Sequence, residues 1–285
     1  MDYHIVIPAH NEEAFLERTL NSILKQTLLP KKVIIVNDNS TDHTEEIIDR
    51  FIAKSDVFEK LNATSSSEHM PGSKVINAFQ KGFKLVEDDP YDFIVKLDAD
   101  LILPNHYFEI IANHFKNDSR IGVAGGFIYE KNETGNWELN HPMDTDHVRG
   151  AFKAYSKPCF TAIGGLKNAM GWDTIDELLA QYHGFTVHTD PELKVKHLRP
   201  TGKAYNKKAK RLQGKAMYTM RYNIMLTCIA SIKMALKQKS ITSLWNNVIG
   251  YFEASLKSTP YVVTKEEGKF IRHLRWRNIK RKLSK

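Results

Sequence analysis

The stretch VKLDADLILP, residues 95–104, carries the main clue to the fold. An apolar run of strand type leads directly into two carboxylates, Asp98 and Asp100, and an apolar Leu-Ile-Leu follows them. Along an extended strand, residues i and i+2 point to the same side, so the two carboxylates can converge on one point. Carboxylates that close repel one another unless a proton or a cation lies between them. The stretch therefore predicts either a solvated acidic turn or a cation site.

The first 130 residues alternate between strand and helix patterns. Short apolar runs at 5–8, 33–36 and 93–97 predict buried strands, and segments with helical spacing of apolar residues separate them. This alternation predicts an α/β fold, a doubly wound sheet that is mixed but mainly parallel, with helices on both faces. Ligands of such sheets bind at the carboxyl ends of the strands, where the segments HNEE, NDNSTD and DAD fall. The acid pair is therefore expected at a ligand-binding edge.

Later segments predict less regular structure and then helices. Residues 131–160 are expected to be loop, and residues 185–200 a short hairpin or paired strands. After residue 205 the pattern becomes helical, which predicts a C-terminal helical extension at 206–285 behind a domain at 1–205. Within that domain we expect two halves, at 1–100 and 101–205.

Charge is distributed unevenly along the chain. Residues 201–285 carry 20 Lys and Arg against 3 acids, whereas residues 1–200 carry 21 against 30. The uncharged run at 222–232 is too short for a spanning helix, which needs about 20 residues. The last 17 residues hold eight Lys and Arg interleaved with apolar residues, which predicts a basic amphipathic helix of the interfacial type. The C-terminal helices are therefore expected to meet an anionic membrane surface, and a solvated basic face is the alternative.

Other features bear on location and on nucleic acid. Two cysteines, Cys159 and Cys228, give no disulfide framework and are typical of a reducing compartment. The N-terminus lacks a basic region followed by an apolar core, so no secretory signal is expected. We expect a cytoplasmic protein that can associate with the inner face of a membrane. Nucleic acid has the same electrostatic requirement, but the sequence shows no recognition module for it.

Five motifs, in order, carry a resemblance to a known family. They are IVIPAHNEE, VNDNSTD, the helix around GSKVINAFQKG, VKLDADLILP, and GGLKNAMGWDTIDELLAQYHGF with PELKVKHLRP. Together they resemble the family 2 glycosyltransferases of the GT-A fold. The resemblance implies transfer of a sugar from a nucleotide-diphosphate donor, expected to be UDP-linked, with inversion at the anomeric carbon. It also implies a glycan or lipid-linked acceptor in bacterial-type surface or extracellular polysaccharide synthesis.

The resemblance implies that residues 1–100 are the nucleotide-binding half of the domain and that residues 101–205 are the acceptor half. Asp38 matches a residue that accepts a hydrogen bond from the base, although an Asp here can also form an Asx turn or cap a helix. Asp98 is expected to serve the ribose or the outer shell of a metal. The other positions similar to nucleotide contacts are Pro8, Ala9, Glu12 and Lys74, and the alternative for Lys74 is an ordinary surface lysine.

A divalent cation, Mg²⁺ or Mn²⁺, is the cofactor that the resemblance implies. Asp100 is the expected direct ligand, His197 can complete the metal shell, and Asp98 is a further possible ligand. Hard divalent ions prefer oxygen ligands, and Mg²⁺ typically takes one or two carboxylates together with substrate phosphates. A lone histidine is more often structural, so that alternative stays open for His197.

The acceptor side needs a carboxylate that removes a proton from the attacking hydroxyl. Asp173, Asp176 and Glu177 share one face of a predicted helix at about 173–183, near its N-terminus, where the helix dipole favours anions. Counted back from Gly184, the resemblance places the base at Asp173. Asp176 and Glu177 stay rivals, and all three acids can alternatively be first-turn helix stabilisers.

Neighbouring residues complete the expected acceptor site. Trp172 stands where the family usually has a Glu, and it is expected either to stack on a sugar ring or to pack at an edge. Gly164 and Gly165 resemble a flexible acceptor loop. Two other functions stay open: a nucleotidyltransferase of similar fold, and a catalytically inactive nucleotide- or sugar-binding module. The first would place a glycine-rich basic loop after the first strand, where this chain has the acidic HNEE.

Overall fold

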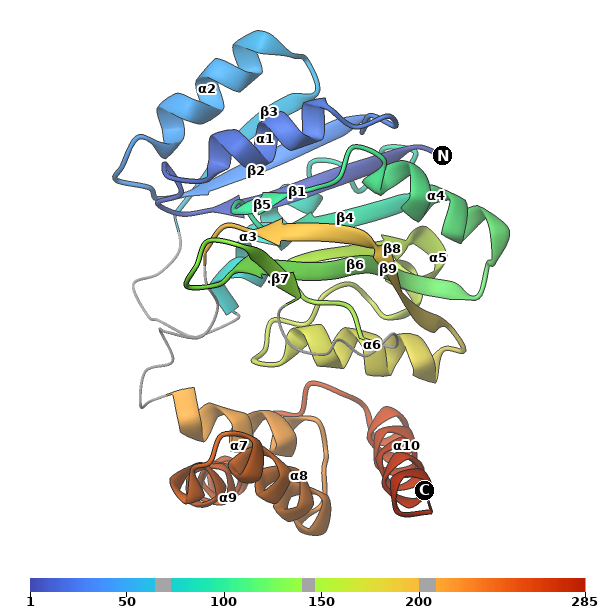
Figure 1. Ribbon diagram of the computed structural model, residues 1–285. Coiled ribbons are helices and arrows are strands. Elements are labelled where there is room, and N and C mark those ends of the chain that lie inside the picture. The colour runs from blue at the N-terminus through green and yellow to red at the C-terminus, as the bar shows by residue number, and fades with distance from the viewer. Residues whose placement is uncertain (65–72, 140–146, 200–208, 285) are drawn as a thin grey trace. The chain divides into compact units, whose positions relative to one another are not determined.

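The computed structural model describes residues 1–64, 73–139, 147–199 and 209–284 (Figure 1). These residues form two compact units. The α/β unit holds residues 1–64, 74–139, 147–166 and 183–199, and the helical unit holds residues 73, 167–182 and 209–284. The expected boundary at residue 205 lies outside the described residues.

A mixed sheet, curled and mainly parallel, forms the α/β unit. Its strand order is β3-β2-β1-β4-β8-β6-β9-β5, with β7 paired to β6. β8 runs antiparallel to both β4 and β6, so β1, β2, β3, β4, β6 and β9 all point the same way. The predicted fold class is therefore confirmed. The strands are β1 (Tyr3–Ala9), β2 (Lys32–Asp38), β3 (Phe58–Ala63), β4 (Phe93–Leu97), β5 (Leu101–Ile102), β6 (Ile121–Lys131), β7 (Trp137–Leu139), β8 (Phe152–Ser156) and β9 (Thr186–His197).

Helices cover both faces of this sheet. On one face, Tyr3 of β1 stacks on Phe93 of β4 and contacts Phe108 of α4. On the other face, Gly82 of α3 lies so close to β1 and β2 that a Cβ on it would come within 2.7 Å of their valine side chains. Strands buried on both faces explain the continuous apolar runs in the sequence. The helices of this unit are α1 (Leu16–Leu24), α2 (Thr44–Lys54), α3 (Ser73–Phe83), α4 (Tyr107–Asn117) and α5 (Lys157–Ala162).

Two sequence expectations are wrong in this unit. Residues 131–160 were expected to be loop, but they contain β7, β8 and α5, and β8 lies in the middle of the sheet. Its sequence FKAYS includes a lysine, Lys153, that is fully buried, and this polar residue hides the strand pattern. The hairpin expected at 185–200 is instead the single strand β9, whose irregular step between Asp190 and Lys194 holds the turn-like residue Pro191.

The helical unit contains α6 (Trp172–Tyr182), α7 (Ala209–Thr219), α8 (Ile224–Lys237), α9 (Ile241–Leu256) and α10 (Lys265–Leu283). α7 and α9 meet at two glycines, because a Cβ on Gly214 would lie 1.8 Å from the carbonyl oxygen of Asn247 and one on Gly250 would lie 2.0 Å from that of Arg211. In the part of the chain that the structure describes, no helix is both long and apolar enough to span a bilayer.

Candidate active site

The acid pair lies in a turn that buried hydrogen bonds hold in place. β4 ends at Leu97, and the turn leads into β5. The Thr19 hydroxyl of α1 donates to the Ala99 carbonyl at 2.7 Å and accepts from the Leu101 amide at 3.0 Å. The Asp98 amide donates to the Ala151 carbonyl at 2.7 Å. Because the turn is pinned on both sides and Asp100 is only 7% exposed, the interpretation as a solvated acidic turn is wrong.

Asp98 and Asp100 differ in their partners. The ammonium group of Lys96, itself buried, contacts the Asp98 carboxylate and donates to the Gly150 carbonyl at 2.9 Å. The Asp98 side chain stays one-third exposed. Asp98 therefore has a compensating charge from its own strand, whereas Asp100 faces groups from other strands.

Asp100 lies beside a histidine whose orientation is fixed from behind. The register of β5 with β9 places Leu101 opposite His197. His197 Nε2 lies 3.3 Å from Asp100 Oδ2, and its Nδ1 lies 3.1 Å from Glu130 Oε1 at the end of β6. Burial lowers the pKa of His197, but hydrogen bonds and charge from Asp100 and Glu130 outweigh it and raise that pKa above its ordinary value. The two ring nitrogens thus each face a carboxylate.

Arg199 joins this group to the loop after β1. Its guanidinium lies 3.7 Å from Asp100 Oδ2 and 2.5 Å from Glu12 Oε2, and it lies over the ring of Phe15. The Glu12 amide donates to the Thr44 hydroxyl at 2.7 Å. Burial, opposed by Arg199 and assisted by the acid pair, raises the pKa of Glu12 to about 7.

These residues form one charged group, the Asp100 cluster, drawn from the ends of β1, β4, β6 and β9. It holds four carboxylates against two permanent cations, so its formal charge is −2 when every carboxylate is ionised and the histidine is neutral. A cluster with that deficit favours a cation. Its members are Glu12, Lys96, Asp98, Asp100, Glu130, His197 and Arg199.

Other predicted donor residues lie at the same edge of the sheet. Pro8 and Ala9 end β1 and pair with the last residues of β2. Asp38 is the last residue of β2 and is buried, and its carbonyl lies 2.7 Å from His10 Nδ1. Lys74 lies in the first turn of α3, next to the undescribed residues 65–72. The carboxyl edge thus carries the predicted residues that end β1, β2, β4 and β9.

The predicted acceptor residues belong to both units. Gly164 and Gly165 have φ of +66° and +68° and end α5, with amides that donate to carbonyls in its last turn. α6 belongs to the helical unit and begins at Trp172, within one residue of the prediction. Asp173 lies in its first turn and is partly exposed, whereas Asp176 and Glu177 are buried. The Glu177 amide donates to Asp176 Oδ1 at 2.7 Å, so the Asp176 carboxylate accepts a hydrogen bond from the backbone of its own helix.

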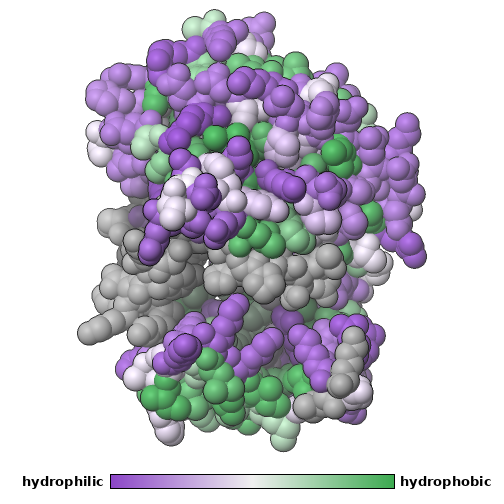
Figure 2. All heavy atoms as spheres, viewed as in Figure 1, coloured by the Kyte–Doolittle hydropathy of each residue, from purple (hydrophilic) through white to green (hydrophobic). Residues whose placement is uncertain are grey.

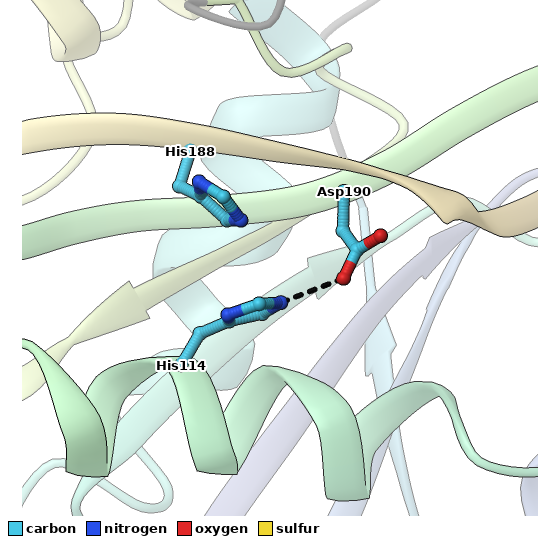
Figure 3. A group of neighbouring side chains, drawn as sticks. All are labelled: His114, His188 and Asp190. Atoms are coloured by element: carbon cyan, nitrogen blue, oxygen red, sulfur yellow. Dashed lines mark hydrogen bonds and ion pairs between the residues drawn. The ribbon is translucent and has the colours of Figure 1, made fainter.

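A second cluster of possible ligands lies elsewhere in the α/β unit. His114 comes from the last turn of α4, and His188 and Asp190 come from β9 (Figure 3). Their ligand atoms all lie within 4.8 Å of one another, the one such group of three among the described residues. His114 Nε2 lies 2.7 Å from Asp190 Oδ2, and the two imidazoles are 4.4 Å apart. Two imidazoles and a carboxylate suit a borderline transition metal, but the His114–Asp190 contact also satisfies both groups without one.

Sequence reasoning missed several of these residues. Arg199 lies two positions after His197 in the same motif, so the alternation that paired Asp98 with Asp100 could have identified it. The same spacing relates His188 to Asp190. Glu130 carried only a weak signal, a single acid at the end of an apolar run.

Known proteins share this fold and parts of this sequence. A poly-β-1,6-N-acetyl-D-glucosamine synthase of Staphylococcus aureus is 29% identical over 42% of the chain, but the match spans only 27% of the synthase. An uncharacterized glycosyltransferase of Mycoplasma genitalium is 29% identical over 59% of the chain and 57% of its own length.

Two solved structures are similar in fold at low identity. S. aureus TarS, in complex with UDP-GlcNAc, gives a TM-score of 0.58 at 15% identity, covering 79% of this chain and 68% of TarS. A mannosyltransferase of Pyrobaculum calidifontis, in complex with GDP-Man and Mn²⁺, gives 0.56 at 16% identity, covering 89% and 75%. Both have the GT-A arrangement seen here. The family description "Glycosyl transferase family 2" matches residues 4–171, more than half of the chain, and the chain therefore belongs to this family.

Proposed function

We propose that the chain transfers a sugar from a UDP-linked donor to a hydroxyl of a glycan or lipid-linked acceptor, with inversion and with help from a divalent cation. The observation that carries this proposal is the Asp100–His197 pair, buried at the carboxyl edge of the sheet and oriented by Glu130. The similar proteins support it, since one is a polysaccharide synthase and two bind UDP-GlcNAc or GDP-Man.

The Asp100 cluster fits Mg²⁺ or Mn²⁺. Neighbouring ligands of one octahedral ion with bonds of about 2.1 Å lie about 3.0 Å apart, and Asp100 Oδ2 and His197 Nε2 are 3.3 Å apart. A carboxylate behind a ligating histidine fixes its ring orientation, which is the position of Glu130. A bound ion would supply positive charge to the diphosphate as it leaves. Asp98 would serve the ribose or the outer shell, as Lys96 already compensates its charge.

The remaining donor residues would contact different parts of the nucleotide. Asp38 would accept a hydrogen bond from the base, with Pro8, Ala9 and Lys74 lining the nucleotide site. Arg199 presents a planar guanidinium beside Asp100, and that group suits bidentate contact with phosphate. It would exchange its contact with Glu12 for the diphosphate. The loss of that ion pair is tolerable because Glu12 already has a raised pKa.

Asp173 would act as the base. The acceptor oxygen forms a bond to the anomeric carbon while the bond from that carbon to the diphosphate oxygen breaks on the opposite face. The hydroxyl proton passes to the Asp173 carboxylate, and the nucleoside diphosphate leaves with the electron pair. Trp172 precedes the base on α6, but it is buried, so packing is the alternative that its position favours. Gly164 and Gly165 would supply a loop without side chains.

A donor panel tests this function. The full chain is incubated with UDP- and GDP-sugars, with and without Mg²⁺ or Mn²⁺, and released nucleotide diphosphate is measured. We expect metal-dependent release of UDP from a UDP-sugar. Release of pyrophosphate would instead indicate a nucleotidyltransferase, and binding without turnover across the panel would indicate an inactive binding module.

Two variants test which cluster binds the functional metal ion. Asp100→Asn should abolish the metal-dependent release, and Asp88→Asn, an exposed acid before β4, is the matched control. Because His188 belongs to a second possible metal cluster, Mn²⁺ binding is also measured in His188→Ala. We expect that variant to keep Mn²⁺-dependent release. Retained turnover in Asp100→Asn together with loss in His188→Ala would move the functional metal to the second cluster.

A further inference from the structure

Large apolar side chains gather on the outside of α8 and α9. Of the fifteen that are exposed in the described part of the chain, ten lie at residues 224–261. Figure 2 shows hydrophobic residues gathered over these helices. We define the α8–α9 face by six of them, each at least 48% exposed: Ile232, Leu236, Ile241, Trp245, Phe252 and Leu256.

On α9, the exposed apolar residues and the buried residues lie on opposite sides of the helix. At 3.6 residues per turn, its four members of the α8–α9 face form a single stripe. The opposite side holds small or polar residues that are buried: Ser243, Asn247, Gly250 and Ala254. Gly250 contacts the backbone of α7 directly. Helices that lie in apolar surroundings have this arrangement, with small residues between the helices and large apolar residues outside.

The charged residues near the α8–α9 face indicate which apolar surroundings it suits. Residues 224–261 contain four lysines and one acid, Glu253, which already pairs with Arg211 at 2.7 Å. Lys233, Lys237 and Lys239 are exposed near the end of α8. Lysines around an apolar stripe suit the anionic headgroups of a bilayer, with the stripe below them. An ordinary protein partner would need acidic residues to complement the same lysines.

The C-terminal helix α10 has a different arrangement from the one expected. Its apolar residues Ile271 and Leu274 are buried, and Phe270 packs on Tyr182 of α6. Arg272 and Arg275 donate to the Arg221 carbonyl and the Tyr222 hydroxyl, both at 2.7 Å. Ile271 and Leu274 are therefore used inside the helical unit, while Trp276 and Ile279 stay partly exposed, so α10 offers less apolar surface than its sequence predicts.

We propose that the α8–α9 face is a membrane-docking surface that enters the interface of a bilayer containing anionic lipid. The two helices have 14 and 16 residues, so at 1.5 Å per residue they are about 21 and 24 Å long and shorter than the ~30 Å hydrocarbon core. They lie in the interface and do not cross it. The inference stands apart from the proposed chemistry, because the face contains none of the donor, metal or base residues.

Vesicle binding tests the proposal on the full chain. Cosedimentation is measured with vesicles of phosphatidylcholine alone and of phosphatidylcholine mixed with phosphatidylglycerol, at low and high salt. We expect binding to the mixed vesicles that salt weakens. The variant Trp245→Ser/Phe252→Ser/Leu256→Ser should bind at least about tenfold more weakly, while its circular dichroism and thermal unfolding stay as in the wild type because all three side chains are exposed.

A matched control separates this face from apolar surface in general. Leu29→Ser/Leu85→Ser/Leu139→Ser removes three exposed leucines of the α/β unit and should bind vesicles as the wild type does. Trp245→Phe keeps the apolar character, so it should bind normally but lose most of the blue shift of tryptophan emission on vesicles. A shift of equal size in Trp245→Phe would show that Trp245 does not enter the bilayer.

Two outcomes would overturn the proposal. One is equal vesicle binding by the wild type and the α8–α9 serine variant. The other is a wild type that ignores vesicles and self-associates in analytical ultracentrifugation, with the serine variant monomeric, since the face would then join two copies of the chain. Donor turnover with a soluble acceptor is measured in parallel, and we expect the serine variant to retain it, so a failed vesicle result and a failed activity result are distinguishable.

Discussion

In the α/β unit, β1, β2 and β4 bury their apolar side chains on both faces, and polar segments lie at or directly after their ends. In the helical unit, α8 and α9 bury mostly small or polar residues and expose large apolar ones. The first arrangement makes a rigid edge on which charged groups can be held at fixed distances. The second makes a surface suited to apolar surroundings. Under the functions proposed above, the α/β unit would hold the donor, and the helical unit would supply the base and the membrane-docking surface.

The largest effect is expected from removal of the proposed base, which tests whether the helical unit takes part in the transfer reaction. Asp173→Asn removes the proposed base from the helical unit and leaves the Asp100 cluster intact. We expect transfer to fall about 10³-fold, as for loss of a general base, with nucleotide-sugar affinity unchanged in calorimetry. Asp176→Asn and Glu177→Gln are the comparison variants, and if either one abolishes transfer while Asp173→Asn does not, the base is misplaced.

A second prediction concerns what holds the helical unit together. Gly214→Ala places a methyl group on the α7–α9 contact, where the Asn247 carbonyl leaves no room. We expect a loss of about 2–3 kcal/mol in the free energy of unfolding, typical of overpacking, measured by denaturant titration. Limited proteolysis should then cut first between residues 209 and 256. Lys215→Ala, the next residue of the same helix, is the control, and equal stability of the two variants would contradict the tight contact.

A smaller effect is expected behind the proposed metal ligand in the α/β unit. Glu130→Ala leaves His197 without the carboxylate at its Nδ1. We expect Mn²⁺ affinity to fall about tenfold, at the low end for loss of such a partner, measured by electron paramagnetic resonance. Glu133→Ala, an exposed acid in the following turn, should bind Mn²⁺ as the wild type does. An unchanged affinity in Glu130→Ala would leave His197 with a structural role.

The smallest effect is a pH dependence of stability that arises at Glu12. Because burial raises the pKa of Glu12 from its ordinary value near 4.5 to about 7, the folded chain keeps a proton there that the unfolded chain has lost. Between these two values the unfolded state binds fewer protons, so stability falls as pH rises.

Glu12→Gln should flatten this dependence between pH 5 and 8. We expect a difference of roughly 1 kcal/mol across that range, after allowance for solvent screening, measured as the melting temperature of the metal-free chain. Glu17→Gln, an exposed acid of α1, should leave the slope unchanged. A slope that persists in Glu12→Gln would assign it to another group.

Much of the fold could be predicted because several of its strands are mostly apolar and are followed by polar motifs. β1 and β2 contain the uninterrupted apolar runs 5–8 and 33–36, and β4 has a single lysine, Lys96, in an otherwise apolar run. Polar motifs follow all three strands directly, so alternation alone gave a mainly parallel sheet and its binding edge. β8 could not be predicted in the same way. Its buried Lys153 breaks the apolar pattern, and only its pairing with β4 and β6 makes it a central strand.

The amino-acid sequence by itself determined the family, the edge of the sheet and the acid pair, because these depend on local patterns of apolar and charged residues. Only the tertiary structure decided that Asp100 meets His197, Glu130 and Arg199, because strand register brings together residues that are far apart in the chain. It also decided which apolar residues stay exposed. Composition marked α10 as the interfacial helix, but packing buried its Ile271 and Leu274 and left larger apolar side chains of α8 and α9 exposed.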